Sequence, residues 1–485
     1  MRLGNLINEI DYIELVNIEE YDEEIESITY NSKKAKPNDL FVCLVGEHVD
    51  GHEFAEEALA NGALACVVER RLSIDAPQIV VSSTAEAVAQ ISNIFYAKPS
   101  TKLNIIGVTG TNGKTTVTHL IQKLYEAFEQ ECALIGTLGH KFSSEDTYRD
   151  AKHTTPQAPE LQCLLYDINE KCIDNVVMEV SSHSLVQHRV DYVDYNGAVL
   201  TNLTQDHLDF HITMSNYFKA KSKLFSDLVT GDFAVINLDD NYAENFLEVI
   251  SPSVNRYTYG IKNNADVIAK DISFSGEGAS FICVIKDKEY NVNLAMNGMF
   301  SVYNILAAIT TALALNFDIE KSIRVLEKIP GVAGRFEVVT TKPTVIVDYA
   351  HTPDGLENVL KAAKEITPSE GSLICIVGCG GDRDATKRPK MGKIAEELAD
   401  KVIVTSDNPR SENPQQIITD ILAGFKSTTD VIVEPDRELA IKEAYKIANI
   451  NDVVLVAGKG HEDYQILANE TIHFDDREKV REIFG

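Results

Sequence analysis

The sequence predicts an α/β fold with three domains: a small α/β domain, a central parallel-sheet domain and a C-terminal, doubly wound sheet. Three observations favour this fold class. The length of 485 residues corresponds to about three domains. An apolar strand, 103–109, leads through a glycine-rich turn into an amphipathic helix. Beyond residue 334, apolar strands alternate with helices, which is typical of a mostly parallel sheet.

The first domain is predicted to comprise residues 1–100. Apolar segments alternate with segments of helical spacing, and Lys98-Pro99-Ser100 then interrupts the pattern. The predicted strands are 40–45, 63–68 and 78–81, and the predicted helices are 53–60 and 85–96.

The second domain is predicted to comprise residues 101–333, with a β-rich insertion where short alternating runs are broken by Gly and Asn. The third, residues 334–485, is predicted to be Rossmann-like. The elements predicted in the second domain are strands 103–109, 175–180, 197–200 and 233–237, helices 114–128 and 303–314, and the insertion 257–292. Those of the third are strands 344–348, 373–377, 402–405, 430–433 and 452–457, and helices 356–364, 393–398, 415–423 and 438–448.

The chain is strongly acidic: 45 Lys and Arg against 74 Asp and Glu give a formal charge of −29. Such a surface repels phosphate backbones and anionic lipid, so we expect neither nucleic acid nor a membrane as a partner. An anionic substrate then needs a local cationic pocket, which makes Lys and Arg inside motifs informative.

Targeting and redox features are consistent with a cytoplasmic protein. The N-terminus lacks the pattern of a signal peptide, and no apolar stretch reaches the 18 residues that a membrane-spanning helix needs. The 8 cysteines are scattered and match neither zinc nor redox spacings, so we expect reduced thiols. We expect a monomer without membrane insertion.

The turn after the first strand of the second domain has the composition of a phosphate loop, Gly107 to Thr116. Its glycines let backbone N–H groups converge on an anion, and the following helix adds its positive end. Lys114 can reach the β- and γ-phosphates of a nucleotide, and the Thr115 hydroxyl can bind Mg²⁺. The loop predicts an ATPase-like domain. The loop does not distinguish GTPases, kinases and transport ATPases. Its glycine spacing differs from the common phosphate-loop pattern, because position 108 is Val and the first glycine falls at 107.

Several long motifs occur in a fixed order along the chain. They are Gly110-Thr-Asn-Gly-Lys-Thr-Thr116, Met178-Glu-Val-Ser-Ser-His183, Thr201-Asn-Leu-Thr-Gln-Asp-His-Leu-Asp209, Asn297-Gly298 with Tyr303-Asn304, Gly334-Arg-Phe-Glu337 and Asp348-Tyr-Ala-His-Thr-Pro353. On these motifs the chain resembles the Mur ligase superfamily over nearly its whole length. Within that superfamily it most resembles the ligases that add the third peptide residue to a UDP-sugar dipeptide, UDP-N-acetylmuramoyl-L-alanyl-D-glutamate.

The resemblance implies an ATP-dependent ligase that phosphorylates the acceptor carboxylate and lets an amine attack the acyl phosphate. Phosphoryl transfer needs positioning and charge neutralisation, which two Mg²⁺ ions, lysine and arginine would supply. The implied ATP-binding positions are Gly110, Thr111, Asn112, Gly113, Lys114, Thr115, Thr116, Asn304, Arg335 and Asp348. The implied catalytic positions are Lys114, Lys221, Glu179 and His207, and the implied metal ligands are Thr115, Glu179, His207 and Lys221, the last as a carbamate.

The resemblance also implies where the UDP-sugar peptide binds. The implied positions are Tyr30, Ser32, His48, Val49, Asp50, Thr154, Thr155, Ser181, Gln187 and Arg189. For the positions in the first domain, simple turn chemistry is the competing interpretation, because Asn, Asp and Gly favour turns. The chain departs from the family at Ser184, where Gly is usual, which puts local backbone detail in doubt.

The incoming amino acid is predicted to be meso-2,6-diaminopimelate. The Asp-Asn-Pro-Arg motif, 407–410, follows a predicted strand and marks the diaminopimelate-adding branch of the family. Diaminopimelate has a carboxylate at its far end that lysine lacks, and the planar fork of Arg binds a carboxylate through two hydrogen bonds. A salt bridge from Arg410 to Glu412 is the competing interpretation. The implied amino-acid positions are Arg383, Asp407, Asn408, Pro409, Arg410, Gly458 and Glu462.

Other functions stay open at this point. The chain could be a lysine-adding ligase of the same type, a folylpolyglutamate synthase, or a nucleotide-binding protein without ligase activity. The first-domain motifs and Arg410 argue against the first two. Phosphate release that requires both acceptor and amino acid separates a ligase from the third.

Overall fold

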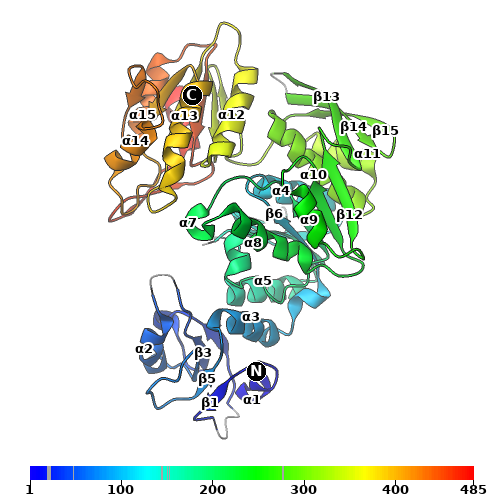
Figure 1. Ribbon diagram of the computed structural model, residues 1–485, viewed down its shortest axis with the longest axis vertical. Helices are drawn as coiled ribbons and strands as arrows, with labels where there is room; N and C mark the ends of the chain where they lie inside the picture. The colour runs from blue at the N-terminus through cyan, green and yellow to red at the C-terminus, as the bar shows by residue number, and fades with distance from the viewer. Residues whose placement is uncertain (19–22, 47–48, 144–145, 150, 152, 276–277) are drawn as a thin grey trace. The chain divides into compact units, whose positions relative to one another are not determined.

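The protein is described by a computed structural model that covers residues 1–18, 23–46, 49–143, 146–149, 151, 153–275 and 278–485 (Figure 1). Contacts divide the chain into two compact units, Met1–Gly107 with Gln130–Ala198 and Val108–Glu129 with Val199–Gly485. The predicted α/β fold class is confirmed, whereas the predicted domain boundaries near residues 100 and 333 stay predictions.

The first sheet has five strands in the order β1-β5-β4-β3-β2, parallel except for β1. Side chains of β3 alternate between two cores: Leu40 and Val42 pack with α1 and α3, and Phe41 packs with α2. Both faces are covered, which explains why its inner strands are apolar throughout. The elements are α1 (Leu3–Ile7), β1 (Glu14–Val16), β2 (Ser27–Thr29), β3 (Asp39–Val42), α2 (Ala55–Ala60), β4 (Ala65–Val68), β5 (Gln78–Val80) and α3 (Thr84–Phe95).

The second sheet has ten strands in the order β15-β14-β13-β12-β11-β10-β6-β9-β7-β8. Its strands are β6 (Asn104–Thr109), β7 (Cys132–Gly136), β8 (Gly139–Lys141), β9 (Asn175–Glu179), β10 (Gly197–Leu200), β11 (Phe233–Asn237), β12 (Asn255–Gly260), β13 (Val267–Ser275), β14 (Gly278–Ile285) and β15 (Lys288–Leu294). Its helices are α4 (Lys114–Ala127), α5 (Ala158–Glu170), α6 (Ser182–Val186), α7 (Leu208–His211), α8 (Met214–Ser226), α9 (Ala243–Val249), α10 (Met299–Ala314) and α11 (Ile319–Leu326).

The β-rich segment predicted as an insertion is continuous with this sheet. Strand β12 pairs in parallel with β11 and with β13, and β14 and β15 follow as antiparallel neighbours. The predicted β-rich character of the segment is confirmed, and its strands extend the sheet beyond β11. Short alternating runs reveal strands, but they do not reveal which edge those strands join.

The third sheet has six strands in the order β16-β17-β21-β18-β19-β20, with helices on both faces (Figure 1). Helices α12, α13 and α14 cover one face, and α15 and α16 cover the other. The elements are β16 (Glu337–Thr341), β17 (Thr344–Asp348), α12 (Pro353–Ile366), β18 (Leu373–Val377), α13 (Arg388–Leu398), β19 (Lys401–Val404), α14 (Pro414–Leu422), β20 (Val431–Val433), α15 (Arg437–Ile447), β21 (Val453–Ala457) and α16 (Asp476–Phe484). This is the doubly wound arrangement that the sequence predicted. Strands β22 (Tyr464–Ile466) and β23 (Thr471–His473) form a separate antiparallel pair.

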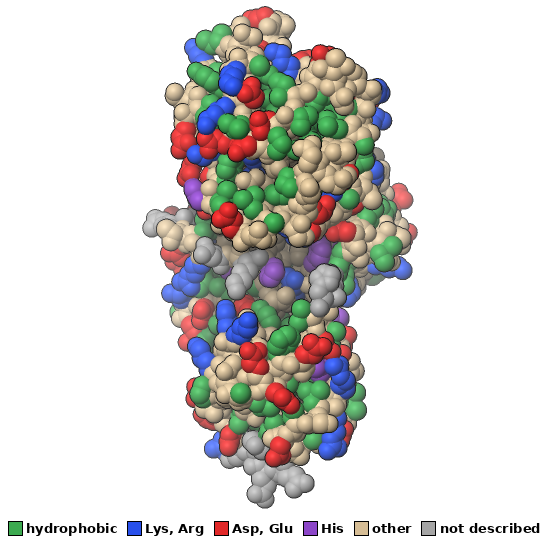
Figure 2. All heavy atoms as spheres, turned by 90° about the vertical axis from the view of Figure 1, so that its left-hand side faces the viewer, with side chains coloured by type: hydrophobic (Ala, Val, Ile, Leu, Met, Phe, Trp, Pro, Cys, Tyr) green, Lys and Arg blue, Asp and Glu red, His purple; other side chains and the backbone are tan. Residues whose placement is uncertain are grey.

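Charged side chains of both signs are interspersed on the face drawn in Figure 2. None of the helices in the described ranges combines the length and the apolar character that crossing a bilayer requires.

The central strand of the third sheet offers a test of this packing. Leu455 on β21 is fully buried against the α12 face. Leu455→Ala should lower the free energy of unfolding by about 2–5 kcal/mol, because it leaves a cavity in a close-packed core. Urea denaturation followed by circular dichroism measures the change. Leu439→Ala, at a side chain that is 45% exposed, should change it by less than about 0.5 kcal/mol. Equal effects of the two substitutions would contradict the assigned packing.

Candidate active site

The glycine-rich loop lies between β6 and α4, and two of its glycines adopt conformations that other residues rarely take. Gly110 has φ +151° and Gly113 has φ +87°. A Cβ atom at Gly110 would lie 1.8 Å from Thr201 Oγ1, and one at Gly113 would lie 2.5 Å from Asn304 Oδ1, on the buried side of α10. Backbone angle and close neighbours therefore both require glycine.

Residues after β10 hold this loop in place. Thr201 Oγ1 donates to Asn112 O at 2.6 Å, and the Asn112 N–H donates to Asn202 Oδ1 at 2.9 Å. The Thr111 N–H donates to Asn202 O at 2.9 Å. Asn112 Nδ2 also donates to Asp354 Oδ2 at 2.8 Å, in the first turn of α12. The loop conformation is thus set by two residues of the motif that begins at Thr201, and by Asp354, which the sequence alone did not single out.

Two lysines from different helices meet at the loop. Lys114 Nζ donates to Gly110 O at 2.9 Å and to Thr111 O at 2.8 Å. Lys221, on α8, donates to Gly110 O at 2.8 Å and to Thr109 Oγ1 at 3.3 Å. Burial, and secondly the charge of Lys114, lower the pKa of Lys221 well below its usual value. Cationic and N–H groups gathered in this way suit a phosphate chain.

Thr115 and Thr116 lie buried in the first turn of α4, and Arg335 reaches the first of them. Arg335 Nη2 donates to Thr115 Oγ1 at 3.1 Å, and its guanidinium lies 4.5 Å above the ring of Tyr349. Arg335 Nε is buried without a hydrogen-bond acceptor. The guanidinium is therefore anchored on one side and keeps a donor for an anion.

Asp348 connects the segment before β16 with the end of β17. It accepts hydrogen bonds from the Phe336 N–H at 2.6 Å and from the Ala350 N–H at 2.7 Å. Burial raises the pKa of Asp348 to about 6, although Arg335 and these two hydrogen bonds oppose the rise. These contacts give Asp348 a structural role, and its ATP-binding role stays a prediction.

His207 stands at the start of α7 with φ +53°. Its Nε2 lies 3.2 Å from Asp206 Oδ2, and the backbone N–H of His207 donates to Asp206 Oδ1 at 2.9 Å. Burial disfavours the charge of Asp206, but His207, His351 and Lys387 outweigh it and lower its pKa. Within the described ranges, no group of three or more His, Cys, Asp or Glu side chains could hold a metal ion.

In the unit that contains the N-terminus, Glu179 is fully buried at the end of β9. Its carboxylate accepts from the Thr137 N–H at 2.8 Å and from Thr137 Oγ1 at 2.9 Å. A Cβ atom at Gly136 would lie 2.4 Å from Glu179 Oε1. Thr154 Oγ1 joins the same group, 3.0 Å from Thr137 Oγ1. Carboxylate oxygens are ligands that Mg²⁺ prefers, so the role of Glu179 as a metal ligand stays a prediction.

Four of the predicted acceptor positions lie together in this unit. The Ser181 N–H donates to Thr155 Oγ1 at 3.1 Å, and Arg189 Nη1 donates to Thr155 O at 3.2 Å. Arg189 Nη2 donates to Gln187 Oε1. Ser184, where the family usually has Gly, donates its hydroxyl to Ser181 O at 2.6 Å within the first turn of α6. The departure at Ser184 therefore adds a local hydrogen bond.

The remaining acceptor positions in the first sheet have protein partners of their own. The Tyr30 hydroxyl donates to Glu160 Oε1 at 2.6 Å, and the Ser32 hydroxyl donates to Glu57 Oε2 at 2.5 Å. Burial raises the pKa of Tyr30 above its usual range.

Asp50 accepts from the His52 N–H at 3.0 Å and from Arg70 Nη2 at 2.6 Å, and Arg70 lowers its pKa. Both contacts agree with the turn interpretation of this segment. Val49 is exposed, whereas His48 lies outside the described residues.

The predicted amino-acid positions lie on loops that follow β18, β19 and β21. Arg410 has φ +52°, its N–H donates to Ile466 O at 3.1 Å, and its Nη1 donates to Gly381 O at 2.8 Å. Glu412 pairs with Arg388 at 2.8 Å, and the structure of the described residues has no salt bridge between Arg410 and Glu412.

Three of these positions are buried: Asp407, Asn408 and Pro409. Asn408 Nδ2 donates to Glu462 Oε2 at 2.8 Å. Gly458 has φ +122°, and a Cβ atom there would lie 3.1 Å from Asp407 Oδ2. Arg383 is exposed, and its Nη1 donates to Asp382 O at 2.9 Å. Its role is not explained by any contact to the other positions.

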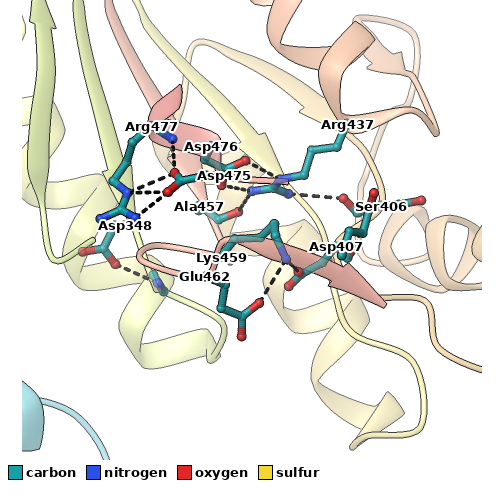
Figure 3. A network of polar contacts seen from close by, with 12 residues as sticks. Asp348, Ser406, Asp407, Arg437, Ala457, Lys459, Glu462, Asp475, Asp476 and Arg477 are labelled. Atoms are coloured by element: carbon teal, nitrogen blue, oxygen red, sulfur yellow. Dashed lines mark hydrogen bonds and ion pairs between the residues drawn. The ribbon is translucent and has the colours of Figure 1, made fainter. Parts of the chain in front are cut away.

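Sequence reasoning missed the buried Arg437, which connects these loops (Figure 3). On α15, its Nη1 donates to Ser406 O at 3.2 Å and its Nη2 to Ala457 O at 3.0 Å. It forms a fully buried ion pair with Asp476, with Nη2 and Oδ2 2.7 Å apart. The two hydrogen bonds to backbone oxygens link the ends of β19 and β21, and the ion pair fixes the guanidinium against the start of α16. The only signal in the sequence was an Arg at the start of an amphipathic helix.

A strand, a glycine-rich loop and a helix, with Lys114, Lys221 and Arg335 gathered around the loop, define a nucleotide-binding α/β protein of the phosphate-loop class. The chain belongs to the Mur ligase family. It matches three domains of that family, described as the Mur ligase family catalytic domain over 24–98, the Mur ligase middle domain over 108–312 and the Mur ligase glutamate ligase domain over 334–460.

Relatives resemble the chain over its length. Proteins of Bacillus cereus and Clostridium botulinum, both named UDP-N-acetylmuramoyl-L-alanyl-D-glutamate--2,6-diaminopimelate ligase, are 45% and 43% identical, covering 95% and 100% of this chain and 94% and 99% of their own. A solved structure titled with the same name has a TM-score of 0.69 at 34% identity and covers 100% of this chain and 98% of its own. A Mycobacterium tuberculosis folylpolyglutamate synthase, 16% identical with a TM-score of 0.63 and covering 76% of this chain and 92% of its own, shares the fold alone.

The buried ion pair makes a testable prediction. Arg437→Met should lower the free energy of unfolding by about 3–5 kcal/mol, because it leaves the Asp476 charge buried without a partner. Adding Asp476→Asn should recover part of the loss. Urea denaturation measures both. As the control, Arg481→Met breaks an exposed contact to Glu337 and should cost at most about 1 kcal/mol. A loss in Arg437→Met as small as in the control would contradict the role of the pair.

Proposed function

We propose that this chain is an ATP-dependent ligase that adds meso-2,6-diaminopimelate to UDP-N-acetylmuramoyl-L-alanyl-D-glutamate during the synthesis of peptidoglycan precursors. The observation that carries the proposal is the full-length similarity, at 45% and 43% identity, to two proteins that are named for this activity. The Asp-Asn-Pro-Arg motif at the end of β19 supports it, because this is where such sheets bind ligands.

The reaction must activate a carboxylate before an amine can attack it. A triphosphate and a carboxylate together carry about five negative charges, so cationic groups have to offset them. In this proposal Lys114 neutralises the phosphates, the loop N–H groups orient them, and Arg335, which donates to Thr115 Oγ1, contacts the transferred phosphate. Asn304, a buried residue on α10, is the candidate contact for adenine.

Two Mg²⁺ ions are part of the proposal, with Thr115, Glu179, His207 and Lys221 as candidate ligands. The Thr115 hydroxyl and the Glu179 carboxylate offer oxygen, the ligand atom that Mg²⁺ prefers. Bound Mg²⁺ would stabilise the charge of the transferred phosphoryl group. Lys221 can contribute only as a carbamate, since an ammonium repels a cation. Its low pKa supports this role, because the neutral amine is the form that adds CO₂.

The amino acid is proposed to bind with one carboxylate at Arg410 and Arg383 and its distal ammonium at Glu462. The acceptor is proposed to bind through the positions near Thr155, Arg189 and the first sheet. The cytoplasmic location and the monomeric state stay predictions of the sequence.

Substrate choice is tested with a competition. Purified protein is incubated with the UDP-sugar dipeptide, ATP, Mg²⁺ and equimolar diaminopimelate, lysine and ornithine, and the products are identified by mass spectrometry. We expect only the diaminopimelate adduct. A lysine adduct would favour the lysine-adding alternative. Phosphate release that needs neither acceptor nor amino acid would favour a nucleotide-binding protein without ligase activity.

Arg410 is predicted to bind the distal carboxylate of diaminopimelate. Arg410→Ala should raise KM for diaminopimelate by about tenfold or more and leave KM for ATP unchanged, because one bidentate pair contributes about 2–4 kcal/mol. Initial rates of phosphate release measure both constants. Arg481→Ala, at an exposed arginine, is the matched control and should change neither. An unchanged KM for diaminopimelate in Arg410→Ala would remove Arg410 from this role.

Removal of the metal gives a further prediction. EDTA should abolish phosphate release, and an excess of Mg²⁺ should restore it, because the charge of the triphosphate is then neutralised again. Glu179→Gln should increase the Mg²⁺ concentration needed for half-maximal rate. Full activity in EDTA, or an unchanged Mg²⁺ requirement in Glu179→Gln, would count against the assigned ligands.

A further inference from the structure

Lys459 is a fully buried lysine among the proposed amino-acid positions (Figure 3). It follows β21 and is flanked by Gly458 and Gly460, which have φ +122° and +55°. A Cβ atom at Gly460 would lie 2.6 Å from Gly334 O, so the chain turns tightly here. A buried ammonium is costly unless hydrogen bonds and opposite charges surround it. Its partners therefore indicate what it does.

The ammonium group of Lys459 contacts three side chains from two loops. Its Nζ donates to Glu462 Oε2 at 3.0 Å and to Asn408 Oδ1 at 3.1 Å, and it lies 3.7 Å from Asp407 Oδ1. Asn408 Nδ2 donates to the same Oε2 of Glu462 at 2.8 Å. Both donors thus hold one oxygen of the carboxylate, and neither uses Oε1.

The charges in this cluster do not balance. Lys459 contacts the two carboxylates of Asp407 and Glu462, the nearby Arg437 is already paired with Asp476, and Asp407 Oδ1 is buried without a hydrogen bond. An additional positive group would complete the cluster. The second ammonium of the proposed amino acid is a group of that kind.

Several groups influence whether Glu462 is ionised. Burial raises its pKa, Lys459 acts against this, and Asp407 adds to the rise. Three groups from other elements also interact with the Glu462 carboxylate: Arg437 on α15, Tyr464 on β22 and Tyr349 after β17. Lys459 is the cation in direct hydrogen-bond contact, so its loss would let Glu462 take up a proton closer to neutral pH.

We infer that Lys459 is a positioning residue that orients the Glu462 carboxylate and keeps it charged to receive the distal ammonium of the incoming amino acid. This inference rests on the proposed function. It adds a residue that the binding positions alone do not include, and it makes binding of the amino acid depend on pH in a specific way.

The test is the pH dependence of KM for diaminopimelate in Lys459→Met. Between about pH 6.5 and about pH 8.5, this variant should raise KM by about tenfold or more at the acidic end and by less at the basic end, because Glu462 loses its proton there. KM for ATP should not change. Glu462→Gln cannot titrate, so its KM should be raised evenly, and Lys459→Met should add little to it. The matched control is Lys442→Met, at a half-exposed lysine on α15, which should behave as wild type.

A KM in Lys459→Met that is unchanged, or raised equally at every pH, would overturn the inference, since a purely structural role has no pH profile. Circular dichroism checks the fold. If Lys459→Met does not fold, the inference is tested on the wild-type protein. Its KM for diaminopimelate should stay within about twofold over this pH range, and a rise of about tenfold toward pH 6.5 would overturn the inference. Failure of the proposed function is recognised separately, because the wild-type protein would then form no tripeptide product at all.

Discussion

The parallel pairing of β17, β21, β18 and β19 is the constraint on which the C-terminal candidate residues depend. Asp348 pairs with Ala457, Ile376 with Val456 and Val377 with Val404, so all four strands end at the same level. Each loop that follows therefore begins at one edge of the sheet. Helices cover both faces, which leaves this edge as the place where polar side chains can gather without disturbing either core.

Buried charges then shape what gathers there. Arg437 and Lys459 are both fully buried, and each is matched by carboxylates and backbone or amide oxygens. Lys221 is also buried, but its hydrogen-bond acceptors are the neutral Gly110 O and Thr109 Oγ1. Burial and the charge of Lys114 outweigh the attraction of Asp206, so the pKa of Lys221 falls, whereas Arg437 remains a cation and serves as a structural link.

Much of the fold could be predicted because its signals are local. The strand predicted at 344–348 is observed as Thr344–Asp348, and the helix after the glycine loop begins at Lys114, as predicted. Other predictions failed at boundaries. The helix predicted from 393 begins at Arg388, because Pro389 occupies its first turn, where proline is tolerated. Strand β16 was missed, since its residues are only partly buried at a sheet edge and lack an apolar run.

By itself, the sequence determined the order of strands and helices, the glycines that the phosphate loop requires, and the motifs that identify the family. These follow from backbone angles and from periodic burial, which depend on neighbouring residues. Only the tertiary structure decided that Arg437 bonds with Asp476, 39 residues away, and that Lys459 reaches Asn408, 51 residues away. Such contacts arise when strands distant in the chain pair side by side, because pairing fixes which loop ends meet, and no local pattern contains that information.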